Sequence, residues 1–525
     1  MNGIRFSGLA SGMDTDSIVK QLMQVERLPL DRFKQEKKIL EWQRDDYRTL
    51  NKEMEQFRTY LFDKMLKKNT FVPKNVESSN STIVSATANS NAPDMTSSIQ
   101  VTKLATSSRW ASEGAVKTDW REGINFVDGK ATFAFKTTNA NGVESETINI
   151  TINETDTVDD VLNKINNSSL GITAMKGNFL RDDDTMQETI VFTNKSSGSG
   201  NYEIAVQDAN TNTFMSNLGF QTDASNYLTG FQDGEDAELT INGMYTKQKS
   251  NTFTISGVTY TLKDVGNVTI STKTDVDLAI ENIKEFVDKY NDLLDKVNGK
   301  LNETKYRDYR PLTDEQKEAM SDREIELWEE RAKSGHLRRD PILSSGFSSI
   351  RTALYTKVQP GDKGINSDFD ILSEIGITTT KNYLDGGKLE IDETKLRKAL
   401  ETEPNAVYEL FAKTTDSDLS SKSSKDLTSA ERQEKFNESG LVVRMRDILY
   451  DTINRIEEKA GNQYSELENY TIGKNIDDIN DSIDDFERRL QQIESRYWSQ
   501  FTAMEKAIQK ANEQSGWLMQ QFSSM

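Results

Sequence analysis

Residues 31–61 read DRFKQEKKILEWQRDDYRTLNKEMEQFRTYL, and an apolar or aromatic residue recurs there at every seventh position. The repeating residues are Phe33, Leu40, Tyr47, Met54 and Leu61. Near the other end of the chain, apolar residues follow one another in steps of three and four: Ile476, Ile479, Ile483, Phe486, Leu490, Ile493 and Tyr497. Both spacings are heptad patterns, which are typical of helices that pack lengthwise against other helices. The sequence therefore predicts long coiled-coil helices from both termini.

Both heptad seams are imperfect. The partner position of the N-terminal seam is Glu36, then Gln43, so its first half is partly polar. In the C-terminal seam the step from Tyr497 to Phe501 repeats a step of four, a stutter that locally unwinds a coiled coil. An ordinary amphipathic core helix is the alternative interpretation of the first seam. We predict that the residues of both seams make assembly contacts: Phe33, Leu40, Tyr47, Met54, Leu61, Ile483, Leu490, Ile493, Tyr497 and Phe501.

A shorter helix is predicted ahead of the N-terminal seam. The polar run from Asp14 to Ser17 offers several N-caps, and Ile18, Leu22 and Val25 then share one helix face. Pro29 is expected to end or kink this helix, so that a second helix runs from about residue 31 to 68. We expect charged substitutions in the two seams to leave the middle of the chain folded and to abolish assembly.

The middle of the chain changes character. Residues 109–274 alternate apolar and polar residues between turns such as Asn242-Gly243, which is typical of β-hairpins. A short helix at 157–166 is also expected there, with a capping box at Thr157. From about residue 275 helical patterns return, with capping boxes expected at Thr313 and Ser321, and residues 415–438 have the composition of a solvated linker. The predicted fold class is multidomain α+β. The expected domains are a helical leg at 1–72, a mixed helical domain of 73–108 with 275–440, a β-rich plate at 109–274 made of two domains (about 109–236, and 237–274 with neighbours), and a coiled-coil leg at 441–525 that pairs with the N-terminal helices.

Composition excludes several classes of function. The 525 residues carry a formal net charge of -20, and phosphate backbones and anionic lipids both require basic surfaces, so neither is expected as a partner. No stretch approaches the roughly 20 apolar residues that span a bilayer, so membrane insertion is not expected. The chain has no cysteine, which excludes disulfides and thiolate chemistry and suits export of an unfolded chain. Its first residues lack the pattern of a cleaved signal peptide, and we expect export by another route.

Candidate catalytic residues are sparse. His336 is the only histidine and is expected to be exposed at a helix end, so no Ser-His-Asp arrangement can be assembled with it. Residues 182–184 are three aspartates that lack the spacing of a calcium loop, and 198–200 is a flexible Gly-Ser-Gly loop. Trp110, Trp120 and Tyr227 could bind sugars, although strand packing is the better interpretation. We expect no enzyme activity, no catalytic residue, no cofactor and no metal.

Several ordered motifs carry a resemblance to a known family. The opening stretch includes Gly8, Leu9, Ser11, Gly12 and Asp14, and it continues through Ile18-Val19, Leu22-Met23, Pro29-Leu30 and Tyr47-Arg48-Thr49-Leu50-Asn51. Residues 131–206 look like a flagellin-type repeat module. Gly234-Glu235-Asp236-Ala237, Ser334-Gly335-His336-Leu337 and Gly387-Lys388-Leu389-Glu390-Ile391-Asp392 follow in order. Together these motifs resemble the bacterial flagellar filament cap family, also called hook-associated protein 2 or FliD. The helical stretch at 303–333 is less typical of that family.

This resemblance implies a function and a set of partners. Family members form a ring, often a pentamer, at the distal tip of the flagellum, where they assist the insertion and folding of exported flagellin. The resemblance further implies an extracellular location, export through the flagellar type III apparatus without a cleaved signal peptide, an export chaperone, and contacts with flagellin and hook–filament junction proteins. The alternatives are an exported flagellar-tip adhesin that binds host glycans and another axial hook-associated protein.

Overall fold

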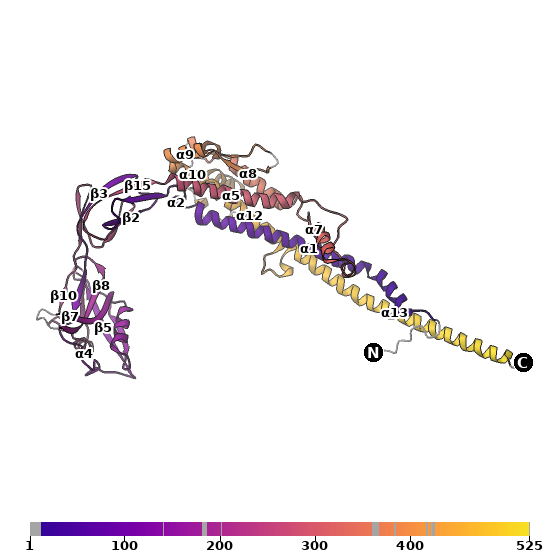
Figure 1. Cartoon of the computed structure of the whole chain (residues 1–525), viewed down its shortest axis with the longest axis horizontal. Helices are drawn as coiled ribbons and strands as arrows, with labels where there is room; N and C mark the ends of the chain where they lie inside the picture. Colours follow the sequence, from indigo (N-terminus) through magenta and orange to yellow (C-terminus); the bar gives the residue numbers. More distant parts are fainter. Residues whose placement is uncertain are drawn as a thin grey trace. The chain divides into compact units, whose positions relative to one another are not determined.

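The structure is a computed structural model that describes residues 12–139, 141–180, 186–200, 202–359, 367–382, 385–415, 418–420, 422 and 426–523. It contains two compact units. The helical unit combines the N-terminal residues up to Phe71 with Val276 onwards, and the β-rich unit comprises Val72–Asp275. Figure 1 shows both units, coloured along the sequence.

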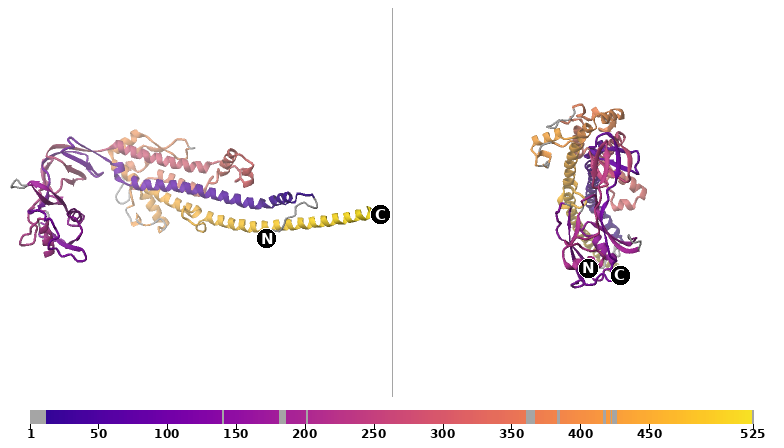
Figure 2. Two further views of the ribbon diagram at one scale, coloured as in Figure 1. Left: turned by 60° about the horizontal axis from the view of Figure 1, so that its bottom comes forward. Right: turned by 90° about the vertical axis from the view of Figure 1, so that its left-hand side faces the viewer.

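The helical unit is built on four long helices that run lengthwise: α1 (Thr15–Tyr60), α5 (Val276–Asn302), α12 (Leu441–Ala460) and α13 (Thr471–Ser523). Helix α1 packs against each of the other three, as Figures 1 and 2 show. The shorter elements are η1 (Leu61–Met65, a π-helical turn), α2 (Lys68–Phe71), α6 (Asp314–Glu318), α7 (Asp322–Lys333), α8 (Pro341–Tyr355), η2 (Ser367–Phe369), η3 (Leu372–Ile375), β16 (Ile377–Thr379), β17 (Leu389–Ile391), α9 (Glu393–Thr402), α10 (Pro404–Ala412), η5 (Asp418–Ser420), α11 (Ser429–Glu438) and η6 (Leu467–Asn469).

Helix α1 is continuous through Pro29, so the prediction that this proline ends a first helix is wrong. An internal proline removes one backbone hydrogen bond and costs about 3 kcal/mol in a helix. Here the flanking residues Met23 and Leu30 are both buried in one apolar cluster with α13. Their burial continues on both sides of Pro29 and stabilises the helical conformation across it.

Arg444 is the most heavily hydrogen-bonded buried side chain of the helical unit. It is 1% exposed and donates to five carbonyl groups at the ends of α8 and α11. The acceptors are Ala353, Thr356, Lys357, Phe436 and Asn437. Burial lowers the pKa of Arg444 to about 10, which still leaves the guanidinium charged at neutral pH. The helix ends therefore receive the donors that their last carbonyls lack within the helices.

The β-rich unit contains two hydrophobic cores. The first lies between a five-stranded sheet of order β1-β15-β3-β11-β12 and a three-stranded sheet of order β13-β14-β2. Its strands are β1 (Lys74–Ser78), β2 (Val84–Ala88), β3 (Met95–Lys103), β11 (Ala237–Ile241), β12 (Met244–Gln248), β13 (Thr252–Ile255), β14 (Val258–Leu262) and β15 (Gly266–Thr274). All of the pairs in these two sheets are antiparallel.

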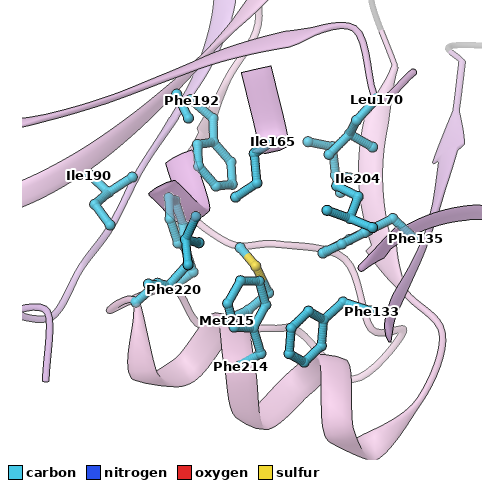
Figure 3. Close-up of a cluster of buried hydrophobic side chains, with 14 of the residues drawn as sticks. Phe133, Phe135, Ile165, Leu170, Ile190, Phe192, Ile204, Phe214, Met215 and Phe220 are labelled. Atoms are coloured by element: carbon cyan, nitrogen blue, oxygen red, sulfur yellow. The ribbon is translucent and has the colours of Figure 1, made fainter. Parts of the chain in front are cut away.

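The second core contains many aromatic rings. Phe133 and Phe214 stack with ring centroids 3.9 Å apart, and Phe192 stacks on Phe220 at 4.4 Å (Figure 3). This core lies among sheets of order β10-β4-β8-β7 and β6-β5-β9 and two helices. The elements are β4 (Ser107–Ala111), β5 (Lys130–Thr138), β6 (Ile148–Asn153), α3 (Val158–Asn166), β7 (Ile172–Leu180), β8 (Met186–Ser197), β9 (Glu203–Val206), α4 (Ala209–Asn217) and β10 (Phe231–Gln232).

Local sequence signals agree with the structure. The capping boxes predicted at Thr157, Thr313 and Ser321 are confirmed, each with both reciprocal hydrogen bonds. The hairpin turn at Asn242-Gly243 is also confirmed, with φ of 49° and 82° at its two residues. Positive φ at both central residues is what a two-residue turn of this type requires.

Two expectations about the course of the chain differ from the structure. Residues 73–108 do not join residues 275–440, because β1 and β3 pair with β15 and complete the sheet of the β-rich unit. Within 415–438, α11 replaces the expected linker and begins with a capping box at Thr428.

Replacing Arg444 by Met should lower the free energy of unfolding of the helical unit by about 3 kcal/mol or more, because several buried carbonyls lose their donor. Urea unfolding followed by far-UV circular dichroism measures this change. Arg446→Met, two residues further along α12 and only partly buried, is the matched control and should change stability by less than about 1 kcal/mol. Equal effects of the two substitutions would contradict the structural role of Arg444.

Candidate functional site: the paired terminal helices

Helices α1 and α13 pack against each other in antiparallel orientation along the N-terminal part of α1. Their shared cluster contains five buried residues: Val19, Met23, Leu30, Leu490 and Ile493. Ile483, Phe486, Tyr497, Trp498 and Phe501 are only partly buried against this cluster. The seam between the two terminal helices is therefore narrow, with a half-exposed margin along α13.

Polar and aromatic contacts fix the register of this seam. The Phe33 ring meets Phe486 edge to face with centroids 6.2 Å apart, and the hydroxyl of Tyr497 donates to Glu26 at 2.9 Å. Hydrogen bonding to the Glu26 carboxylate raises the pKa of Tyr497. These contacts are exposed or half-exposed, where each is worth well under the burial of one apolar side chain. They orient the helices and add little to the strength of the seam.

The structure separates the predicted contact residues into two groups. Phe33, Ile483, Leu490, Ile493, Tyr497 and Phe501 lie in the α1–α13 seam, and Leu40 is half-buried on α1. Tyr47, Met54 and Leu61 are each 1% exposed or less, in the interior of the helical unit. The seven-residue repeat of α1 therefore continues from the seam into a core. A repeat in sequence cannot distinguish these two environments, because both bury one face of a helix.

Tyr47 illustrates the interior group. Its hydroxyl donates to one carboxylate oxygen of Asp340, whose other oxygen caps α8 by accepting from the N–H groups of Ile342 and Leu343 at 3.0 Å. Burial and the neighbouring Asp340 carboxylate both raise the pKa of Tyr47. This tyrosine holds a helix cap in place and is not available to a partner molecule.

The polar half of the seam is covered by another part of the same chain. Gln43 donates to the carbonyl of His336 at 3.4 Å, and Gln35 donates to the carbonyl of Pro311 at 2.8 Å. Glu36 lines a hollow of about 230 Å³ together with Tyr306 and other residues of the segment after α5. The polar positions of the heptad therefore face the 303–340 segment, which explains their departure from the apolar repeat.

Helix α1 also has an apolar face that nothing in the described part of the chain covers. This face includes Leu22, Val25 and Leu28, and Val25 is 65% exposed. The sequence predicts that Leu22 and Val25 share one helix face, and the structure leaves both of them exposed. The neighbouring face, which carries Val19 and Met23, contacts α13 instead. Two apolar faces follow one another around this helix, and only one of them is buried.

The last turns of α13 are exposed in the same way. Residues 506–523 extend beyond the seam, and their large apolar side chains are mostly solvent-exposed, including Trp517, Met519 and Phe522 at 62–76%. Isolated apolar side chains are normal on protein surfaces, whereas a contiguous group on an uncovered helix end marks an interaction site. The uncovered residues are defined here as the apolar ends: Leu22, Val25, Leu28, Trp517, Leu518, Met519 and Phe522.

The N-terminal motif is only partly described. Gly8, Leu9 and Ser11 lie outside the described residues. Gly12 has a φ of +70°, a conformation that favours glycine, and Asp14 caps α1 by accepting from the N–H of Ser17 at 3.0 Å. The motif thus sets where α1 begins.

The remaining candidates for chemistry do not form a site. His336 is half-buried rather than exposed, it contacts the Ala332 carbonyl at 3.0 Å, and burial lowers its pKa. Trp110 and Trp120 are buried in the second core, which leaves no ring face for a sugar, and Tyr227 donates to Thr138 at 3.0 Å. The three aspartates at 182–184 lie outside the described residues. Within the described ranges, no group of three histidine or acidic residues is placed to hold a metal ion, and no helix is long and apolar enough to cross a membrane.

Paired terminal helices with exposed apolar ends, joined to a β-rich unit, are the features of a structural protein that packs on others through its helix ends. The family models of the C-terminus and the N-terminus of flagellar hook-associated protein 2 match residues 234–513 and 11–108. The chain belongs to the flagellar hook-associated protein 2 family.

Individual relatives agree with this assignment. The chain is 36% identical to flagellar hook-associated protein 2 of Halalkalibacterium halodurans over 99% of this chain and 100% of the relative. It is 30% identical to that of Salmonella typhimurium over 55% of this chain and 51% of the relative. The crystal structure of the D1-D2-D3 domains of the flagellar cap protein FliD from Escherichia coli has a similar fold, with a TM-score of 0.52 at 22% identity, covering 83% of this chain and 99% of that one.

Tyr47→Phe should destabilise the helical unit by about 1.5–3 kcal/mol, because a hydrogen bond to the buried Asp340 carboxylate is lost. Chemical unfolding measures the change. Tyr450→Phe is the control, since that tyrosine is 41% exposed, and it should be neutral within about 0.5 kcal/mol. A neutral Tyr47→Phe would show that Tyr47 does not support the cap of α8.

Leu490→Asp should separate α13 from α1, because it places a charge in a site that is 6% exposed. Hydrogen exchange of residues 15–30 and 486–501 should then accelerate, while exchange in α5 and α12 stays slow. Val25→Asp, on the uncovered face of α1, should leave exchange unchanged. Slow exchange of the seam in Leu490→Asp would contradict the antiparallel pairing.

Proposed function

We propose that this chain is the cap of the bacterial flagellar filament, a non-enzymatic subunit that assembles at the distal tip and assists the insertion of exported flagellin. The observation that carries the proposal is the sequence similarity of this chain to flagellar hook-associated protein 2, at 36% identity over 99% of its length. The crystal structures similar in fold are of flagellar cap proteins. A role in binding and placement is consistent with a chain whose described residues offer surfaces for partners rather than a reaction centre.

The geometry suggests how the two ends of the chain take part. The 18 residues 506–523 of α13 extend about 27 Å at the helical rise per residue. Helix ends of this length gain most of their stability from a packed face. We propose that the apolar ends pack on flagellin or on the hook–filament junction proteins below the cap. The narrow seam behind them allows small adjustments of α13 against α1 as subunits are added.

The proposal includes the remaining partners and the location. The chain would form a ring of its own copies, with a pentamer as the proposed size, at the extracellular tip of the flagellum. It would reach that place through the flagellar type III apparatus without cleavage, escorted by an export chaperone. The absence of cysteine suits this route, because no cross-link can form before the chain has passed through a narrow channel.

The proposal is tested by electron microscopy of filaments and by motility of a strain that lacks the gene. The wild-type chain should restore motility, retain flagellin on the cell and appear as a plate at the distal ends of filaments. Normal capped filaments in the deletion strain, or binding of the purified chain along filament sides rather than at the tips, would overturn the function.

A second experiment tests the apolar ends. Combining Val25→Asp, Trp517→Asp and Phe522→Asp should leave the circular dichroism spectrum unchanged and should release flagellin into the medium, because the uncovered faces can no longer pack on a partner. Tyr464→Asp is the matched control: this residue is 86% exposed in the same unit but lies in the turn before α13. Full motility of the triple variant would exclude the apolar ends as contacts.

A further inference from the structure

The segment between α5 and α8, residues 303–340, forms a fixed platform on the side of α1. Besides the hydrogen bonds from Gln35 and Gln43, the His336 ring lies 6.0 Å from the Trp42 ring. Within the segment, the indole N–H of Trp328 donates to the carbonyl of Arg310 at 2.8 Å. These contacts hold the platform to the middle of α1.

Five cations lie together on this platform. A loop carries Lys305, Arg307 and Arg310, and the turn beside it carries Arg338 and Arg339. Two hydrogen bonds hold the loop and the turn together. Ser334 donates to the Thr304 carbonyl at 2.7 Å, and the N–H of Arg339 donates to the Leu301 carbonyl at 3.1 Å. All five side chains are exposed. We define these residues as the basic patch: Lys305, Arg307, Arg310, Arg338 and Arg339.

The basic patch has no matching carboxylates in the described part of the chain. None of its five cations has a carboxylate oxygen within 4.0 Å there. Other cations of the same segment do have partners: Lys317 and Lys333 both contact Glu329, at 3.0 and 3.4 Å. Even with the exposed Asp308 in the same loop, these five cations give the patch a net positive charge in a chain whose net charge is -20. Such a patch attracts an acidic surface.

Helix α13 carries an acidic surface, opposite in charge to the basic patch. Asp477, Asp478, Asp481 and Asp484 are all exposed, and none has a cationic partner within 4.0 Å in the described residues. Their spacing places them along one side of the helix over about 10 Å. The next acidic residues do have partners, Arg488 for Asp485 and Lys34 for Glu487. We define these four aspartates as the acidic stripe.

The two surfaces do not meet within one chain. No ion pair joins the basic patch to the acidic stripe among the described residues. In the left view of Figure 2, the pink segment before α8 lies above the indigo α1 and the yellow α13 lies below it. Residues 311–329 and α13 line one groove beside α1, but neither the basic patch nor the acidic stripe lines it, and each is open to another molecule.

We propose that the basic patch of one copy of this chain binds the acidic stripe of a second copy. The inference rests on the proposed function, since it names the contact through which copies of the helical unit associate. A second copy is the expected partner because the two surfaces are opposite in charge, similar in size and present on every copy. A contact between two different surfaces of identical chains leads from each copy to the next, and closes into a ring when the rotation allows.

The chemistry of this contact favours reversible association. Exposed ion pairs are individually weak and are screened within about 8–10 Å at physiological salt. Several pairs in one contact add orientation and specificity without a dry apolar interface. Self-association through these surfaces should therefore weaken steeply as salt concentration rises.

Sedimentation velocity of the full-length chain in low and high salt tests the proposal with two charge-reversed variants. Lys305→Glu/Arg307→Glu/Arg310→Glu reverses the patch, and Asp477→Lys/Asp481→Lys/Asp484→Lys reverses the stripe. Each variant alone should associate about tenfold more weakly than the wild type, because like charges now face each other. An equimolar mixture of the two variants should regain association. The reversed patch of the first variant then faces the reversed stripe of the second, and the native stripe of the first faces the native patch of the second. Both pairs of surfaces are opposite in charge.

The control reverses three exposed lysines that lie on separate elements and have no ion pair to another described residue: Lys52→Glu, Lys130→Glu and Lys398→Glu. This control changes the net charge as much as the patch variant and should retain the association of the wild type at low salt. Association of each single variant at the wild-type level, failure of the mixture to recover, or a monomeric wild type at low salt would each overturn the inference. Electron microscopy of filament tips is independent of these outcomes, because a cap seen at the tip with the patch variant would retain the function and remove only this contact.

Discussion

Helix α1 is 46 residues long, and its apolar side has to be covered along its length by partners that come from distant parts of the sequence. Since helices in water are stabilised mainly by packing a face, this one requirement organises the helical unit. Its C-terminal third packs on α5 and α12, its middle is braced by the 303–340 segment, and its N-terminal third is covered on one side by α13. The burial of α1 therefore decreases from a closed core to a narrow seam.

This gradient gives different mechanical properties to the parts of one helix. Around Tyr47 a hydrogen bond ties α1 to the cap of α8, and Arg444 joins the ends of α8 and α11 close to the same core. Toward Val19 only a few buried side chains hold α13 in place. A rigid body with adjustable ends suits a subunit that has to remain folded while its contacts with a growing filament change.

Local signals in the sequence predicted local structure well. The capping boxes at Thr157, Thr313 and Ser321 and the Asn242-Gly243 turn depend on residues within four positions of one another, and all of them are present. The heptads correctly indicated long terminal helices. They could not reveal which repeats lie in a core and which lie in a seam, because that depends on neighbours from elsewhere in the chain. For the same reason the periodicity could not show whether the face of Leu22 and Val25 is buried, since two adjacent apolar faces satisfy the same periodicity.

Pairings over long sequence separations were the least predictable, and they carry a consequence for the order of folding. Strand β1 pairs with β15 about 200 residues later, and Glu26 accepts a hydrogen bond from Tyr497, 471 residues away. Loop closure over such distances precedes any gain from the contacts, so a fold of this kind has a high contact order. When the N-terminus emerges first, the N-terminal part of α1 stays uncovered until α13 has also emerged. For a chain delivered end first, completion of the α1–α13 seam is therefore one of the latest events in folding, and it reports that the whole polypeptide has arrived.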